Sequence, residues 1–139
     1  MRVAVNGFGR VGRVFTRIAL ERGLEVVAVN DVTDAATLAH LLAHDSTYGR
    51  APFAVEHTED MLIADGHKIA VFAQHDPARL PWQDLGVDVV IESTGKFRTR
   101  DQAAVHLGAG ARKVLISAPA KGEVDGWSRS TNSDMNIPF

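Results

Sequence analysis

The sequence predicts an α/β protein whose core is a doubly wound, mostly parallel β-sheet. Two observations support this fold class. Short apolar runs alternate along the chain with helical patterns, and this order builds parallel βαβ units. The apolar runs are continuous rather than alternating, as expected for strands that helices cover on both faces.

The first third of the chain gives the clearest strand and helix signals. Residues 3–6 and 25–31 are short apolar runs that predict buried strands. Between them, apolar residues recur at helical spacing and predict a helix that ends at Gly23. Thr33 or Asp34 is positioned to cap a second helix, which carries Leu38, Leu41 and Leu42.

The rest of the chain continues the alternation with more irregular connections. Residues 44–52 predict a loop, residues 55–72 predict short strands or hairpins, and prolines at 77 and 81 predict a loop or short helix. Residues 87–93 and 113–117 predict two further core strands. The sequence TRDQ at 99–102 predicts a capping box on a helix that ends near residues 108–110.

The first predicted strand runs directly into the pattern G-x-G-x-x-G. Gly7 allows a tight turn, Gly9 allows the backbone to approach a pyrophosphate, and Gly12 lets the helix pack closely on the strand. The following helix start offers N–H groups and partial positive charge to phosphates. Asp31, nineteen residues after Gly12, ends the second strand. Together these features form the dinucleotide-binding fingerprint of a Rossmann-type sheet. A merely tight strand–helix turn, the alternative, does not require Asp31.

Asp31 also bears on the choice of dinucleotide. A carboxylate at this position can accept hydrogen bonds from ribose hydroxyls, and its charge would repel a 2′-phosphate. The next residues are Val32 and Thr33 rather than arginine, so the sequence favours NAD over NADP. The alternative role for Asp31 is that of a turn former or helix cap.

Further candidates lie where other predicted strands end. Ser93, Thr94 and Gly95 follow the third core strand, and Ser117 ends the next. Ligands of open α/β sheets bind along this edge, although ordinary turn chemistry is an alternative. Arg10 could lie over the phosphates, but an exposed arginine at a helix start is equally common.

Composition and charge argue against several classes of function. The net charge is −2 and no block of Lys or Arg stands out, so we expect no nucleic-acid partner. The chain has no cysteine, and the spacing of His40 and His44 lacks a third ligand, so we expect no metal site. No apolar stretch approaches the ~20 residues of a membrane helix, and no signal segment is apparent, so we expect a cytoplasmic protein without a membrane partner.

Long ordered stretches of the sequence resemble the amino-terminal, NAD-binding half of glyceraldehyde-3-phosphate dehydrogenase. They are VNGFGRVGR at 5–13, VNDVTD at 29–34, LAHLLAHDSTYGR at 38–50, DPARLPW at 76–82, GVDVVIESTGKF at 86–97 and GAGARKVLISAPAKGEVD at 108–125. Erythrose-4-phosphate dehydrogenase shares this framework and is an alternative within the resemblance. We therefore expect a dinucleotide-binding domain over residues 1–125 and a divergent, loose tail over residues 126–139.

The resemblance implies a role for each candidate. Arg10 and Val11 would contact the pyrophosphate through their backbone, and Asp31 would hold the adenosine ribose. Thr94 and Gly95 would line the adenine edge, and Ser117 would lie near the nicotinamide end. His75 stands on the adenine side, where the family usually carries a more basic residue.

The resemblance also implies an activity. The family oxidises an aldehyde with NAD as hydride acceptor, using a cysteine nucleophile and a histidine base. Because the chain has no cysteine and the resemblance ends near residue 125, we assign no catalytic residue and expect no catalysis by this chain alone. A noncatalytic nucleotide-binding or interaction module is the alternative. The resemblance further implies a sheet that is incomplete at its carboxyl-terminal strands, and apolar surface left open there would favour self-association.

Overall fold

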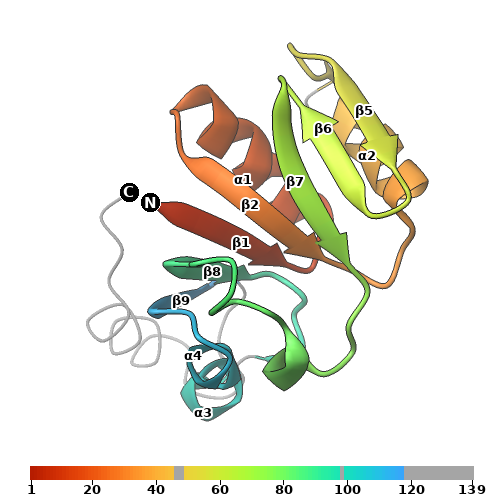
Figure 1. The fold of residues 1–139 in the computed structure, drawn as a ribbon. Helices are drawn as coiled ribbons and strands as arrows, with labels where there is room; N and C mark the ends of the chain where they lie inside the picture. Colours follow the sequence, from red (N-terminus) through yellow and green to blue (C-terminus); the bar gives the residue numbers. More distant parts are fainter. Residues whose placement is uncertain (46–48, 98, 118–139) are drawn as a thin grey trace.

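The main element of the fold is a seven-stranded sheet with strand order β5-β6-β7-β2-β1-β8-β9 (Figure 1). The structure, a computed structural model, describes residues 1–45, 49–97 and 99–117. Five strands run parallel to one another: β1 (Arg2–Asn6), β2 (Glu25–Asn30), β7 (His67–Phe72), β8 (Val89–Glu92) and β9 (Lys113–Ile116). The predicted α/β class with a mostly parallel sheet is confirmed.

An antiparallel hairpin extends the sheet at one edge. It consists of β5 (Val55–Thr58) and β6 (Met61–Ala64), and β6 pairs antiparallel with β7. Residues 56–58 of β5 are exposed and polar, whereas Leu62 and Ala64 of β6 are buried. The prediction of short strands or hairpins in this segment is confirmed.

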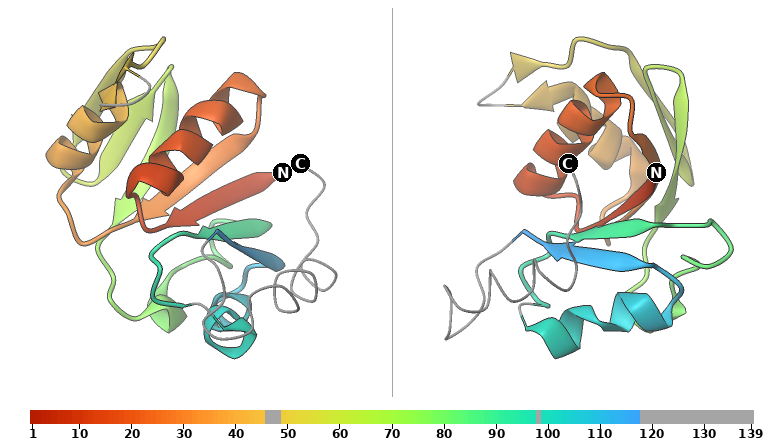
Figure 2. Two further views of the ribbon diagram at one scale, coloured as in Figure 1. Left: turned by 180° about the vertical axis from the view of Figure 1, so that it is seen from behind. Right: turned by 90° about the vertical axis from the view of Figure 1, so that its left-hand side faces the viewer.

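Helices cover both faces of the sheet (Figure 2). On one face lie α1 (Arg10–Glu21) and α2 (Ala35–Ala43). The other face carries the short 3₁₀ turn η1 (Pro77–Arg79), α3 (Arg100–Ala103) and α4 (Val105–Gly108). This arrangement makes the sheet doubly wound.

The core consists of two apolar clusters, one on each side of the sheet. Val3 and Val5 of β1 belong to the cluster beneath α1 and α2, whereas Ala4 belongs to the opposite cluster with Trp82 and Val114. Successive strand side chains point to opposite faces, so both faces of β1 are buried. This explains why the central strands are continuously apolar in sequence.

The ends of α1 follow from local chemistry. Gly23 has a φ of +77° and closes the helix, with the Leu24 N–H donating to the Ala19 carbonyl at 2.9 Å. This left-handed turn is the one glycine favours after a helix. At the other end, Gly9 is the N-cap in extended backbone and makes no side-chain cap hydrogen bond.

Two connections differ from expectation. The segment predicted as a loop contains two short strands that pair antiparallel, β3 (His44–Asp45) and β4 (Gly49–Arg50). Their pairing uses backbone hydrogen bonds, and their sequences contain no apolar residues that would have predicted a strand. The helix predicted from the capping box is present but divided at Ala104 into α3 and α4. The Thr99 capping box itself is confirmed.

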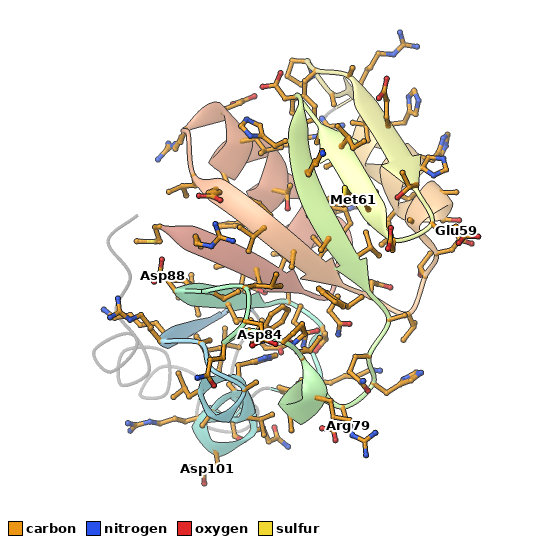
Figure 3. All side chains as sticks on the ribbon, viewed as in Figure 1. Glu59, Met61, Arg79, Asp84, Asp88 and Asp101 are labelled. Carbon is orange, nitrogen blue, oxygen red and sulfur yellow. The ribbon has the colours of Figure 1, made fainter. Side chains whose placement is uncertain are left out.

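The amino ends of the parallel strands are pinned by polar contacts at the surface. Asp88, labelled at the start of β8 in Figure 3, accepts a hydrogen bond from the Arg2 backbone N–H at 2.9 Å. Arg2 also forms an ion pair with Glu25 at 2.7 Å. Among the described residues, no helix is both long enough and apolar enough to cross a membrane.

The Asp34 cap gives a test of α2. The Asp34 carboxylate accepts a hydrogen bond from the Thr37 N–H at 2.7 Å, and this bond lowers the pKa of Asp34 below its ordinary value. Because the Asp34 pKa is lower in the folded state, ionisation of Asp34 stabilises the fold at pH values above the unfolded-state pKa of ~3.9. This stabilisation is lost as the pH falls through the folded-state pKa. We expect Asp34→Ala to lower the melting temperature at neutral pH, with a smaller difference from wild type in acid.

The matched control is Asp34→Asn, which keeps a capping oxygen but removes the charge. It should melt between wild type and Asp34→Ala at neutral pH. Melting curves recorded by circular dichroism across this pH range make the measurement. Equal melting of wild type and Asp34→Ala at neutral pH would show that the cap contributes nothing.

Candidate functional site

The carboxyl ends of β1, β2, β7 and β8 lie at one edge of the sheet (Figure 1). Residues at these strand ends and in the segments that follow them line a hollow. From β1 the chain first builds the sheet on the β2 side and later returns to add β8 on the other side. This reversal is a topological switch point, where open α/β sheets bind ligands. The lining residues are Asn6, Gly7, Gly9, Asn30, Asp31, Val32, Gln74, His75, Pro77, Ser93, Thr94, Lys96 and Phe97.

The glycine-rich turn after β1 is shaped by close backbone contacts. Gly7 has a φ of +92°, and a Cβ there would lie 2.7 Å from the Thr94 nitrogen. A Cβ on Gly12 would lie 2.4 Å from the Gly7 carbonyl oxygen. No larger side chain fits at either position without a backbone shift. A Cβ on Gly9, in contrast, would meet no atom of the described part of the chain within 4 Å, so the backbone there is open to the hollow.

The amino end of α1 lies beside this turn. The first N–H groups of a helix have no intrahelical acceptor, and they carry the positive end of the helix dipole. Within the described residues, no side chain caps this end and the first turn holds no acidic residue. Arg10 and Val11 begin the helix and are exposed. This helix start therefore presents hydrogen-bond donors and partial positive charge.

Asp31 is held at the edge of the hollow by two backbone donors. Its Oδ2 accepts from the Phe8 N–H at 2.8 Å, and its Oδ1 accepts from the Thr33 N–H at 3.0 Å. The carboxylate thus ties the glycine-rich turn to the end of β2. Each carboxylate oxygen has two acceptor sites, so both keep capacity for a hydroxyl donor. The turn-forming role and the ligand-binding role of Asp31 are therefore compatible.

Buried polar groups join the strand ends beneath the hollow. In spatial order they are the Gln74 backbone, Asn30, Asn6 and Glu92, and we call them the polar row. Asn30 Nδ2 donates to the Gln74 carbonyl at 2.9 Å and to Asn6 Oδ1 at 2.7 Å. Asn6 Nδ2 in turn donates to Glu92 Oε1 at 2.7 Å. Because each member is hydrogen-bonded to the next, the polar row holds the side chains of Asn30, Asn6 and Glu92 in place beneath the hollow.

The structure brings together some of the predicted site residues and leaves others aside. Gly7, Gly9, Asp31, His75 and Thr94 line the hollow, whereas Gly12 packs beneath the turn. Four others are outside the lining: Arg10 and Val11 at the helix start, Gly95 in the turn after Thr94, and Ser117 after β9. The Ser117 hydroxyl donates to the Glu92 carbonyl at 3.1 Å, so Ser117 lies next to the end of β8.

Sequence reasoning missed Asn6, Asn30 and Gln74 as lining residues. A usable signal was present, because an asparagine closes each of the first two apolar strands, in VAVN and VVAVN. The rings of His40 and His44 lie 4.8 Å apart, but the described part of the chain contains no cluster of three or more metal-ligating side chains.

A doubly wound parallel sheet with this turn, helix end and strand-end carboxylate defines a dinucleotide-binding domain of the Rossmann type. Residues 1–100 match the family model described as "Glyceraldehyde 3-phosphate dehydrogenase, NAD binding domain". The chain therefore belongs to the glyceraldehyde-3-phosphate dehydrogenase family, within its NAD-binding domain, and the resemblance seen in the sequence is confirmed.

Curated relatives agree with this assignment. The chain is 62% identical over 125 residues to glyceraldehyde-3-phosphate dehydrogenase of Thermotoga maritima, covering 88% of this chain and 38% of that protein. The corresponding enzyme of Geobacillus stearothermophilus is 54% identical over 139 residues, covering 99% of this chain and 42% of that protein. Streptomyces coelicolor has a relative 54% identical over 140 residues, with the same 99% and 42% coverage. The chain thus spans about two fifths of the length of these relatives.

The close contact at Gly12 gives a test of the turn. In Gly12→Ala the new methyl group would overlap the Gly7 carbonyl oxygen, and overpacking of this kind costs about 1–3 kcal/mol. We expect a lower melting temperature and loss of dinucleotide binding. The matched control is Gly108→Ala in α4. Its Cβ would meet nothing within 4 Å among residues 1–45, 49–97 and 99–117, so this variant should melt at or above the wild-type temperature.

A third variant separates folding from binding at the same turn. The new methyl group of Gly9→Ala meets no atom of the described residues within 4 Å, so we expect this variant to melt close to wild type and yet bind the dinucleotide more weakly. Thermal melting and calorimetric titration measure the two effects. Wild-type stability of Gly12→Ala would refute the steric argument.

Proposed function

We propose that the hollow binds NAD in an extended form across the switch point, and that the chain supplies the cofactor-binding part of a glyceraldehyde-3-phosphate dehydrogenase. The observation that carries this proposal is the convergence of the glycine-rich turn, the start of α1 and Asp31 at one hollow. NAD bound there would accept a hydride from an aldehyde. Binding and orientation are the tasks of the residues described.

Each part of the cofactor has a matching surface. The pyrophosphate lies over Gly9 and accepts hydrogen bonds from the backbone N–H groups of Arg10 and Val11, with Gly7 and Gly12 allowing the turn. Asp31 accepts hydrogen bonds from the adenosine ribose. His75 and Thr94 line the same hollow as Asp31, which supports their placement on the adenosine side together with Gly95. Ser117 is assigned to the nicotinamide side because β9 lies beyond β8, on the far side of β1 from Asp31.

The charge of Asp31 supports a preference for NAD over NADP. Its carboxylate stands where the ribose hydroxyls would lie, and a 2′-phosphate there would face a negative charge at hydrogen-bond distance. The following residue, Val32, is exposed and offers no positive charge to a phosphate.

The remaining assignments concern the chain as a whole. We propose that residues 1–125 form the NAD-binding unit and that residues 126–139 form a divergent tail. The tail lies outside the described residues. We also propose that the protein is located in the cytoplasm. The sequence has no cysteine, so we expect no aldehyde oxidation by this chain alone. We also propose self-association through apolar surface left open at the incomplete sheet, which the half-buried Leu115 and Ile116 of the edge strand β9 support.

Calorimetric titration of wild type and Asp31→Ala with NAD and NADP tests the ribose contact. Wild type should bind NAD more tightly than NADP. Loss of a hydrogen bond to a charged group costs about 1.5–3 kcal/mol, so Asp31→Ala should bind NAD roughly 10- to 100-fold more weakly and lose its preference.

The matched control is Asp84→Ala, which removes an exposed carboxylate before β8 (Figure 3) and should leave both affinities unchanged. Melting curves of the variants check that each one folds. Wild type that binds neither nucleotide at millimolar concentration would refute the proposal. An unchanged preference in Asp31→Ala would refute the role of Asp31 alone.

A further inference from the structure

We infer that Glu92 and His106 form a buried positioning pair that fixes Thr94 and Asn6 for dinucleotide binding, although neither member of the pair lines the hollow. The inference rests on the proposed function of the hollow. It goes beyond that function because it assigns a role to two titratable residues that lie behind the binding surface.

Glu92 is surrounded by hydrogen-bond donors. Its side chain is 1% exposed. Oε1 accepts from Asn6 Nδ2 at 2.7 Å, and Oε2 accepts from the Thr94 hydroxyl at 2.6 Å and the Thr94 N–H at 3.1 Å. The fourth contact joins Oε1 to His106 Nε2 at 2.7 Å. An ionised carboxylate can accept all four bonds, and these bonds offset the cost of burying its charge.

His106 is held in one tautomer by its second neighbour. The Trp82 indole N–H donates to His106 Nδ1 at 3.0 Å, and both rings are fully buried. Because an indole nitrogen can only donate, Nδ1 carries no proton. The proton of the neutral ring must then be on Nε2, from which it is donated to Glu92. Trp82 therefore keeps Nδ1 unprotonated, while the Glu92 carboxylate accepts the hydrogen bond from Nε2.

The pair acts on the hollow through three lining residues. Asn6 and Thr94 donate to Glu92, and the ring of Phe97 lies edge-on to that of His106 with centroids 6.3 Å apart. The Thr94 hydroxyl hydrogen is committed to Glu92, and its oxygen accepts from the Lys96 N–H at 3.1 Å. With both functions occupied, Thr94 keeps one rotamer before the ligand arrives, which reduces the entropy lost on binding.

A double-mutant cycle tests whether Glu92 acts through Thr94. NAD affinities are measured by calorimetry for wild type, Glu92→Gln, Thr94→Val and the double variant. We expect each single variant to bind roughly tenfold more weakly, because residue 94 is no longer held in one conformation before the ligand binds. The double variant should bind about as weakly as either single variant, since both remove the same contact. Fully additive losses, or unchanged affinity of Glu92→Gln, would overturn the inference.

Two controls keep the test specific. Glu25→Gln makes the same chemical change at an exposed carboxylate at the far end of β2, and it should leave the NAD affinity unchanged. Thr94→Ser keeps the hydroxyl and should retain most of the affinity that Thr94→Val loses. If Glu92→Gln does not fold, equal affinities of the serine and valine variants would by themselves overturn the inference.

A second measurement needs no ligand. Nitrogen-15 NMR of the histidine rings should show His106 protonated on Nε2 and unprotonated on Nδ1. A proton on Nδ1 in wild type would overturn the inference. Wild type that binds no NAD would refute the proposed function of the hollow and with it the positioning role. Normal NAD binding with an unperturbed Glu92→Gln variant would refute the positioning role alone.

Discussion

The binding edge of this protein depends on side-chain hydrogen bonds that join the ends of neighbouring parallel strands. β1 ends at Asn6, β2 at Asn30 and β8 at Glu92, and each of these side chains is at most 5% exposed. Leaving a buried polar group without a partner costs about 1–3 kcal/mol. Each strand end is therefore stable only beside its neighbour, and the polar row holds the strands in one relative position.

The glycine-rich turn depends on the same edge. The Gly7 N–H donates to the Asn30 carbonyl at 2.8 Å, and the Ser93 hydroxyl donates to the Gly7 carbonyl at 2.6 Å. Gly7 is thus held between the ends of β2 and β8, with Thr94 backbone packed against its α-carbon. A phosphate-binding turn must present its backbone without a side chain in the way, and these contacts keep it in that conformation before any ligand is bound.

Local patterns in the sequence predicted the fold and the centre of the site. The apolar runs, the spacing of Gly7, Gly9 and Gly12, and Asp31 at a strand end are signals that a short window contains. The polar row is different, because its members are brought together only by the sheet: Asn6 and Glu92 are separated by 86 residues. His106, an isolated histidine in the sequence, is fully buried against Trp82 and Glu92. Strand order in the sheet, and not spacing along the sequence, brings such hydrogen-bond partners together.

The two edges of the sheet differ in the way they would receive another strand. β5 exposes Glu56, His57 and Thr58, and polar edge strands discourage pairing with a further strand. β9, the opposite edge among the described residues, carries the apolar and half-buried Leu115 and Ile116. An additional strand would therefore pair more readily at the β9 edge than at the hairpin edge.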